Sequence, residues 1–414
     1  MMANPAPTHL LLIHQVFVGP DEAGGTRHFE LGTRFVSAGH KLTVIASSLN
    51  YFTGKQKTKK PRLVELQQAQ GIDILRAYTY QSLHRSFAWR TVSFFSFMFS
   101  SFLVGIKVPD VDVVMATSPP MFQAFSAWLV AVIRRKPLLL EIRDLWVEYA
   151  VVSGVVKNPL LIALARWAER FLYRRATHIL VNSPAYRDHI MATGIPATKI
   201  SLVPNGVEVR AFAAAVKDPS IREKFQLRDK FVVVYAGALG MVNDIPVILR
   251  AAQRLADDTD IHFLLVGGGI ERDALVQQAN EMQLNNLSFV APVAKTKMPG
   301  ILKSADACVA SLQNIALLTT TYPNKIFDYM AAGKPVILAI DGVIREVVEN
   351  AGGGIFVPPA DDAALAAAVR RLKNDPAAAR AMGEAGQKYV ARYFDRDVQA
   401  RAFSDLVVRM ASHS

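Results

Sequence analysis

The sequence contains a single cysteine, Cys308, among its 414 residues. An internal disulfide is therefore impossible, which is typical of proteins kept in a reducing compartment. Cys308 lies in the apolar run 307–312, where we expect it to be a small buried side chain. Half of the residues are hydrophobic, which excludes a disordered chain. The length is too great for one core and predicts two domains of about 200 residues.

The sequence also lacks a clear membrane-spanning run. The uncharged stretch Thr91–Ile106 has 16 residues, whereas about 20 are needed to cross a bilayer. It belongs to the stretch Phe87–Ile106, for which three interpretations stay open: a buried core helix, a helix lying in the membrane interface, or a transmembrane span. No basic segment precedes Leu10–Phe17, so we expect a first strand there rather than a signal peptide.

Negative charge is scarce in the first half of the chain. Residues 1–206 hold 23 Lys and Arg against 12 Asp and Glu, whereas residues 207–414 hold 24 against 23. The resulting charges, +11 and +1, favour a polyanionic partner for the first half: membrane phospholipid, nucleic acid or a pyrophosphate-linked substrate. The basic loop 50–62 suits anionic lipid headgroups. No recognition module for nucleic acid accompanies it, so we expect no nucleic-acid partner.

The first half begins with a strand–loop–helix–strand unit, in which a glycine-containing loop precedes a helix. The pattern G-x-G-x-x-G is absent, so there is no dinucleotide fingerprint. Gly24 and Gly25 would let backbone approach an anion closely at the helix start. Arg27, in the first turn, is expected either to contact a phosphate or the acceptor, or to be solvated.

Two charged residues, Arg143 and Asp144, follow the apolar run Pro137–Ile142. Ligands bind at the carboxyl ends of strands in open parallel sheets, so this pair is placed for function. The alternative is a buried structural ion pair. Glu148 lies one turn further on and is able to assist Asp144.

A cation and a carboxylate occur close together late in the chain. The polar loop Thr319–Asn324 leads into a helix on which Lys325 and Asp328, three residues apart, share a face. A helix N-terminus with a lysine suits a diphosphate, and a carboxylate suits a pair of sugar hydroxyls. The alternative is an ordinary helix with two solvated charges.

The stretch Y-P-N-K-x-x-D-Y-M-A-A-G-K-P-V, residues 322–336, resembles the nucleotide-sugar signature of family 4 retaining glycosyltransferases. Within that family it is similar to bacterial O-antigen and capsule aminosugar transferases of the N-acetylfucosamine or N-acetylglucosamine type. R-D-L-W at 143–146 and P-N-G-V at 204–207 extend the resemblance over nearly the whole chain. The family's two glutamates are replaced by Thr320 and Asp328, and the loop positions Ala238 and Asn243 lack the family's Arg and Lys.

The resemblance implies an α/β fold of the GT-B type, with two Rossmann-like, doubly wound parallel-sheet domains facing across a cleft. Residues 1–206 would be an acceptor-binding, membrane-facing domain. Residues 207–392 would bind the nucleotide sugar, and 393–414 would form a helix returning to the first domain.

The resemblance also implies the roles of individual residues. Asp144 and Lys325 would be catalytic, and Arg27 and Glu148 would lie near the acceptor. The implied donor-binding residues are Gly24, Gly25, Arg143, Gly237, Gly240, Asn243, Gly268, Val293, Thr320, Thr321, Tyr322, Asn324, Lys325 and Asp328. No D-x-D pair of the metal-using transferases is evident, so we expect neither a metal nor another cofactor.

The implied reaction is transfer, with retention, of an N-acetylated or deoxy hexose from a UDP-sugar to a polyprenyl-diphosphate-linked sugar. Such an enzyme would serve lipopolysaccharide, O-antigen or capsule synthesis. It would be cytoplasmic and peripheral on the inner face of the cytoplasmic membrane. Two other functions stay open: a UDP-sugar 2-epimerase of the same fold, and a non-catalytic scaffold that binds sugar nucleotides.

Overall fold

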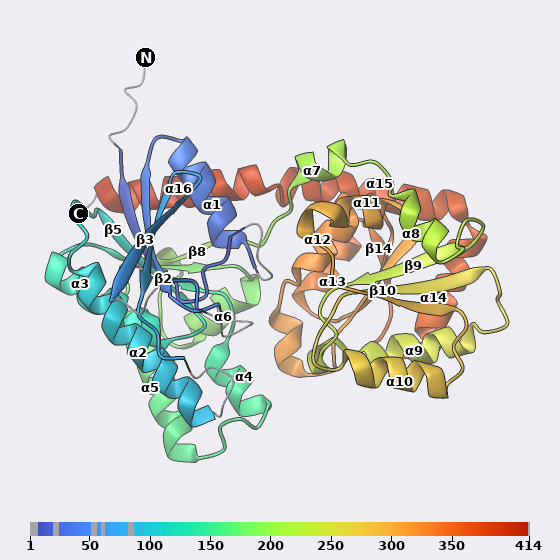
Figure 1. Ribbon diagram of the computed structural model, residues 1–414, viewed down its shortest axis with the longest axis horizontal. Coiled ribbons are helices and arrows are strands. Elements are labelled where there is room, and N and C mark those ends of the chain that lie inside the picture. The colour runs from blue at the N-terminus through green and yellow to red at the C-terminus, as the bar shows by residue number, and fades with distance from the viewer. Residues whose placement is uncertain (1–6, 20–24, 51–55, 59–62, 82–86, 413–414) are drawn as a thin grey trace. The chain divides into compact units, whose positions relative to one another are not determined.

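The computed structural model describes residues 7–19, 25–50, 56–58, 63–81 and 87–412 (Figure 1). The chain divides into two compact units. Unit 1 comprises residues 1–204 and 397–414, and unit 2 comprises residues 205–396. The sequence placed the boundary at residue 206 and the return of the chain at residue 393. Most of the basic loop 50–62 lies outside the described residues.

Unit 1 is built on an eight-stranded sheet with the order β3-β4-β2-β1-β5-β6-β7-β8. Neighbouring strands are parallel except β3 and β4, which are antiparallel. The strands are β1 (His9–Ile13), β2 (Lys41–Ser47), β3 (Val64–Ala69), β4 (Ile72–Ala77), β5 (Val113–Ser118), β6 (Leu138–Ile142), β7 (His178–Val181) and β8 (Ile200–Leu202).

Two strand predictions in unit 1 need correction. The first strand ends at Ile13 rather than Phe17, because the Gln15 amide bonds to the Gln123 side chain and not to a neighbouring strand. The edge strand β3 was not predicted. Its sequence, VELQQA, is mostly polar and its side chains are largely exposed, so it carries no buried-strand pattern.

Helices cover both faces of the unit 1 sheet. They are α1 (Arg27–Ser37), α2 (Phe87–Gly105), α3 (Phe122–Arg134), α4 (Trp146–Val152), α5 (Pro159–Arg175), α6 (Pro184–Ala192) and α16 (Arg396–Ser412). Leu10, Leu12 and Val44 pack with α1 and with the apolar residues of α16 from Ala400 to Met410. Ile45 faces the opposite side, where α2 and α3 pack together.

Helix α2 is a core helix on one face only. Ser93, Phe97 and Ser101 are fully buried, whereas Phe99 exposes 63% of its surface. No helix among the described residues is long and apolar enough to cross a membrane. The interpretation of this stretch as a transmembrane span is therefore not supported, and the interpretation as a core helix holds for one face of α2.

Unit 2 contains a six-stranded parallel sheet with the order β11-β10-β9-β12-β13-β14. Its strands are β9 (Phe231–Ala236), β10 (Ile261–Val266), β11 (Leu287–Val290), β12 (Ala307–Ser311), β13 (Val336–Ala339) and β14 (Gly354–Phe356). Its helices are α7 (Val209–Ala214), α8 (Pro219–Lys224), α9 (Ile245–Arg254), α10 (Arg272–Glu281), α11 (Met298–Lys303), α12 (Asn324–Ala331), α13 (Val343–Asn350), α14 (Asp362–Asn374) and α15 (Pro376–Tyr393).

The four central strands of unit 2, β10, β9, β12 and β13, are buried on both faces, as parallel strands between helices must be. Val232 and Val234 join one apolar cluster with α12, and Val233 and Tyr235 join another with α9 and α14. Cys308 is fully buried within β12, which confirms the role expected for it. Burial raises the pKa of its thiol.

Candidate functional site

Two glycine-containing loops meet at the carboxyl ends of β9 and β10 in unit 2. The Gly237 amide donates to the Val266 carbonyl at 3.0 Å, and the Leu239 amide donates to the Gly268 carbonyl at 2.9 Å. A Cβ atom at Gly267 would lie 1.9 Å from the Gly237 oxygen, so the two loops touch through bare backbone. Gly268 is restricted less severely, because a Cβ there would lie 2.8 Å from the Pro292 ring.

This arrangement leaves two amides of the first loop available. Among the described residues, no acceptor is bonded to the backbone N–H of Ala238 or Gly240. Both are the kind of donor that binds an anion in a loop leading into a helix. The loop then passes through a short 3-10 helix, Met241–Asn243, to the start of α9.

The ammonium group of Lys325 lies beneath this loop. Its Nζ donates to the Tyr235 hydroxyl and to the Asn243 side-chain oxygen, both at 2.8 Å, and lies 4.3 Å from the centre of the Tyr235 ring. A Cβ at Gly237 would be 3.1 Å from Nζ. Tyr235 in turn donates to the Ala238 carbonyl at 2.7 Å. The hydrogen bonds among Lys325, Tyr235 and Asn243 therefore connect α12 to the glycine loop.

All the groups that hold Lys325 are neutral. Among the described residues, no carboxylate lies within ion-pair distance of it. Burial lowers the pKa of Lys325 to about 7, since no negative partner offsets the loss of solvent. Lys325 is partly buried and has no counter-charge among the described residues. It is therefore not one of the two solvated charges that the sequence left as an alternative.

The other signature residues surround the start of α12. Asn324 begins the helix and is exposed, and Asp328 lies one turn after Lys325 on the same helix. The hydroxyls of Thr320 and Thr321 donate to the carbonyls of Leu317 and Leu318, in and after a short 3-10 helix where a loop was predicted.

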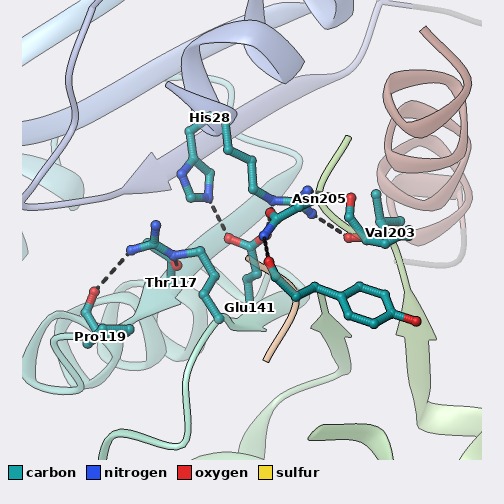
Figure 2. Close-up of polar contacts among 10 residues, drawn as sticks. His28, Thr117, Pro119, Glu141, Val203 and Asn205 are labelled. Atoms are coloured by element: carbon teal, nitrogen blue, oxygen red, sulfur yellow. Dashed lines mark hydrogen bonds and ion pairs between the residues drawn. The ribbon is translucent and has the colours of Figure 1, made fainter. Parts of the chain in front are cut away.

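Two further donor-site candidates are placed mainly by packing. The Tyr322 carbonyl accepts from the Asn205 side chain at 3.1 Å, a contact drawn in Figure 2, and the Tyr322 ring packs edge-on against Phe327. Val293, after β11, is partly buried against the apolar cluster of α12. The glycine loops, Lys325, Asp328 and these residues thus all belong to unit 2.

A second polar group lies inside unit 1, and the sequence did not single it out. Glu141, on β6, is fully buried. It accepts from Arg27 at 3.0 Å and from His28, as Figure 2 shows for the histidine. Burial acts to raise the pKa of Glu141, but the charges of His28 and Arg27 outweigh it and hold the pKa well below its usual range. Burial lowers the pKa of His28, although the charge of Glu141 acts to raise it.

Arg27 is therefore not the residue that the sequence predicted. It is buried, and its remaining guanidinium nitrogens donate to the carbonyls of Val203 and Pro204 at 2.7 and 2.8 Å. The side chain is neither solvated nor offered to a substrate. Its donors hold the end of β8 against α1, because a buried arginine must satisfy its N–H groups inside the protein.

Arg143 and Asp144 follow β6 as predicted, but they do not form the ion pair that was the alternative. Arg143 donates to the Thr117 hydroxyl at 2.7 Å and to the Pro119 carbonyl at 3.3 Å (Figure 2). Asp144 accepts from the Tyr186 hydroxyl at 3.4 Å. Asp144 as a whole residue is exposed in unit 1, but burial around its carboxylate raises the pKa of that group.

The remaining candidates of unit 1 have different outcomes. Glu148 accepts two hydrogen bonds from Arg166, at 2.9 and 2.8 Å, which lower its pKa, so its carboxylate is already paired and not poised to assist Asp144. Gly25 precedes α1, and no atom lies within 4 Å of where its Cβ would be. Gly24 lies outside the described residues.

Two family models match almost the whole chain. Residues 24–206 match the glycosyl transferase 4-like domain, and residues 217–389 match the glycosyl transferases group 1. The chain is a family 4 glycosyltransferase of the GT-B fold. This result confirms the resemblance and the fold class that the sequence predicted.

Three similar proteins illustrate the match. The glycosyltransferase is 23% identical over 406 residues to the putative colanic acid biosynthesis glycosyl transferase WcaI of Escherichia coli, covering 95% of this chain and 98% of that one. Sucrose-phosphate synthase from Thermosynechococcus elongatus superposes with a TM-score of 0.76 at 19% identity, covering 98% and 100% of the two chains. Anabaena HepE in complex with UDP-glucose superposes with a TM-score of 0.71 at 17% identity, over the same shares.

One sequence statement about this glycosyltransferase needs correction. The tripeptide D-x-D does occur, at Asp110–Asp112, Asp258–Asp260 and Asp395–Asp397. The first two precede β5 and β10, at the amino ends of the strands, away from the carboxyl ends that carry the candidate residues. Carboxylates in them pair with Lys136, Arg370 and Lys373, and Asp397 pairs with Arg34.

Proposed function

We propose that this glycosyltransferase moves a sugar, an N-acetylated or deoxy hexose, from a UDP-sugar to a lipid-linked saccharide with retention of anomeric configuration. The observation that carries the proposal is Lys325, which has no carboxylate partner in the described part of the chain and lies beside the loop that holds the amides of Ala238 and Gly240. A diphosphate is an anion that such a set of donors fits. The HepE complex with UDP-glucose, on the same fold, supports a uridine nucleotide as the donor.

In the proposed reaction, the bond from the sugar C1 to the diphosphate oxygen breaks while the acceptor oxygen bonds to C1 on the same face. The departing diphosphate oxygen takes the proton of the acceptor hydroxyl. Lys325 and the two loop amides stabilise the charge that develops on the diphosphate, an electrostatic effect that preorganised donors provide. Asp328 holds the ribose hydroxyls, and Asp144 addresses the transferred sugar.

The acceptor is proposed to be a polyprenyl-diphosphate-linked sugar used for bacterial surface polysaccharide. Its support is the name of the relative WcaI, a colanic acid biosynthesis enzyme, and the positive charge of residues 1–206. Such an acceptor would bring the enzyme to the inner face of the cytoplasmic membrane. We propose no metal requirement, because neutralisation of the diphosphate is assigned to Lys325 and backbone amides.

The test is a panel of radiolabelled UDP-sugars incubated with the purified chain, a lipid-linked saccharide extract and EDTA. Transfer is expected to release UDP and to move label into the lipid fraction. Interconversion of two UDP-sugars without labelled lipid would instead identify a 2-epimerase. Tight binding of UDP without any turnover would identify a scaffold.

The proposed role of Asp328 predicts a loss of donor affinity. Asp328→Ala removes hydrogen bonds between a charged group and the ribose, so the Kd for UDP should rise about 10- to 100-fold. Isothermal titration calorimetry measures the change. Asp273→Ala, which removes a fully exposed carboxylate of the same unit, is the matched control. An unchanged Kd for Asp328→Ala would remove Asp328 from the donor site.

The lowered pKa of Lys325 predicts that donor binding depends on pH. Lys325 loses its proton as the pH rises through about 7, and a diphosphate binds the protonated form. The affinity for UDP should therefore fall about fivefold from pH 7 to pH 8. In Lys325→Arg the charge persists, so the same pH change should have little effect. Calorimetry in buffers of different ionisation enthalpy should show proton uptake only for the wild type. Equal pH profiles would contradict the assignment.

A further inference from the structure

Helix α5 exposes an apolar stripe that its own unit does not cover. Leu160, Leu161, Leu164 and Trp167 expose 75%, 52%, 56% and 57% of their surfaces. Leu160, Leu164 and Trp167 are spaced by four and three residues, so they share one face of the helix. The opposite face packs into unit 1 through Ala168, Leu172 and Tyr173. Single exposed leucines are common in proteins, but a continuous stripe of this kind marks an interaction surface.

The neighbouring helices extend this surface. Figure 1 shows α2, α3 and α5 along the same side of unit 1, and α3 packs against both other helices. Trp128 of α3 and Trp167 of α5 both contact the ring of Phe171, with centroids 4.9 and 5.7 Å apart. We call the exposed side chains of these three helices the apolar face: Trp89, Val92, Phe95, Phe99, Leu103, Leu129, Val132, Ile133, Leu160, Leu161, Leu164 and Trp167.

A positively charged hollow borders the apolar face at the end of α5. It is lined by Arg170, Arg174 and Arg175 together with Trp167 and Phe171. The three arginines are exposed, and none of them forms an ion pair with another described residue. Arg175 lies over the Phe171 ring, 5.4 Å from its centre. Guanidinium groups on an aromatic floor are well suited to bind phosphate.

The nearby carboxylates do not neutralise the positive charge of this hollow. Arg166, one turn earlier, is the arginine of α5 that is paired, with Glu148. Glu169 points into unit 1, where burial raises its pKa to about 7, so its negative charge is weakened at neutral pH. The end of α5 therefore offers three cations to an anion in solution.

We propose that the apolar face is a docking surface for an anionic phospholipid bilayer, and that Arg170, Arg174 and Arg175 hold the phosphate of a lipid headgroup. Leucine and tryptophan side chains enter the interfacial region while the arginines bind headgroups, a combination that gives stable peripheral attachment. A second copy of this chain fits less well, because two such faces would bring unpaired arginines together. The inference rests on the proposed function, which supplies a lipid-linked acceptor in the membrane. It adds which residues of unit 1 contact the bilayer.

The test is sedimentation of the full chain with vesicles of phosphatidylcholine alone or with 30% phosphatidylglycerol, without any sugar nucleotide. Binding is expected only to the anionic vesicles. The triple variant Arg170→Gln, Arg174→Gln, Arg175→Gln should bind about 100-fold more weakly, from the contribution of each arginine near an anionic surface. The matched control Arg371→Gln, Arg380→Gln, Arg392→Gln removes the same charge from exposed sites of unit 2 and should bind within twofold of the wild type.

A second variant tests the apolar stripe. Leu160→Ser with Leu164→Ser should bind the anionic vesicles at least tenfold more weakly while its far-ultraviolet circular dichroism stays that of the wild type. A blue shift of the tryptophan emission on adding anionic vesicles should be smaller in Trp167→Phe, because Trp89 of the apolar face still contributes to it. Equal binding to both vesicle types, or an equal loss in the control, would overturn the proposal. A dimer in analytical ultracentrifugation that the leucine variant dissociates would also overturn it, and would make the face a self-association surface.

These outcomes are distinguishable from failure of the proposed function. Vesicle binding requires neither donor nor acceptor, so it is measured whether or not sugar is transferred. A wild-type chain that transfers sugar but ignores anionic vesicles would overturn the docking surface alone.

Discussion

Lys325→Ala is expected to lower the rate of sugar transfer about 100- to 1000-fold, the usual effect of removing one preorganised donor from a developing negative charge. The loss is expected mainly in kcat, because charge on the diphosphate is greatest as the sugar departs. We expect no second cation to replace it, because Ala238 and Asn243 occupy the places where the resembled family has Arg and Lys. Turnover of a labelled UDP-sugar, measured at saturating donor, checks the prediction.

Two comparisons make the Lys325 result specific. Lys388→Ala removes an exposed lysine of α15 and should leave the rate unchanged. Lys325→Ala should also keep the wild-type melting temperature to within a few degrees, since Tyr235 retains its bond to the Ala238 carbonyl. A variant that transfers sugar at more than a tenth of the wild-type rate would show that the diphosphate is neutralised elsewhere.

Glu141→Ala is expected to destabilise unit 1 by about 3–5 kcal/mol, the usual cost of leaving a buried charge without its partner. The alanine would leave Arg27 buried with only the carbonyls of Val203 and Pro204 as acceptors. Urea denaturation followed by tryptophan fluorescence measures the effect. All four tryptophans, Trp89, Trp128, Trp146 and Trp167, belong to unit 1, so the signal reports that unit alone.

The control for Glu141 is a carboxylate with the same partner type at the surface. Glu148→Ala breaks a hydrogen-bonded pair with Arg166 that is partly exposed, and it should cost less than about 1 kcal/mol. Similar costs for the two variants would mean that water reaches the Arg27 guanidinium when Glu141 is removed.

The sequence located the donor-side helix well because its signal is local. Residues 322–336 carry a loop, a helix start and a helix end in one stretch, and α12 begins at Asn324. The hydrogen-bond partners of Lys325 could not be predicted, because Tyr235 and Asn243 are 90 and 82 residues away along the chain. Only the folding of β9 beside β12 brings them to the lysine.

The interior of unit 1 shows the opposite case. Glu141 is the single charge in the apolar run 137–142, and a lone carboxylate in a buried strand is a signal that a partner must exist. That signal does not name the partner. Arg27 was therefore interpreted as a solvated or substrate-binding residue. The sequence around Arg27 does not indicate that it contacts Glu141 of β6, which lies 114 residues later in the chain.

The discontinuous course of unit 1 has a consequence for its synthesis. Strands β1, β2 and β5 leave the ribosome early, but Phe403, Leu406 and Val407 of α16, which cover them, leave it only after unit 2. At roughly 5–20 residues per second, unit 2 takes on the order of 10 to 40 s to be made. For that time the nascent strands present an open apolar surface, a natural site for a chaperone. Unit 2, begun later, is complete in sequence first, so the order of maturation is the reverse of the order of translation.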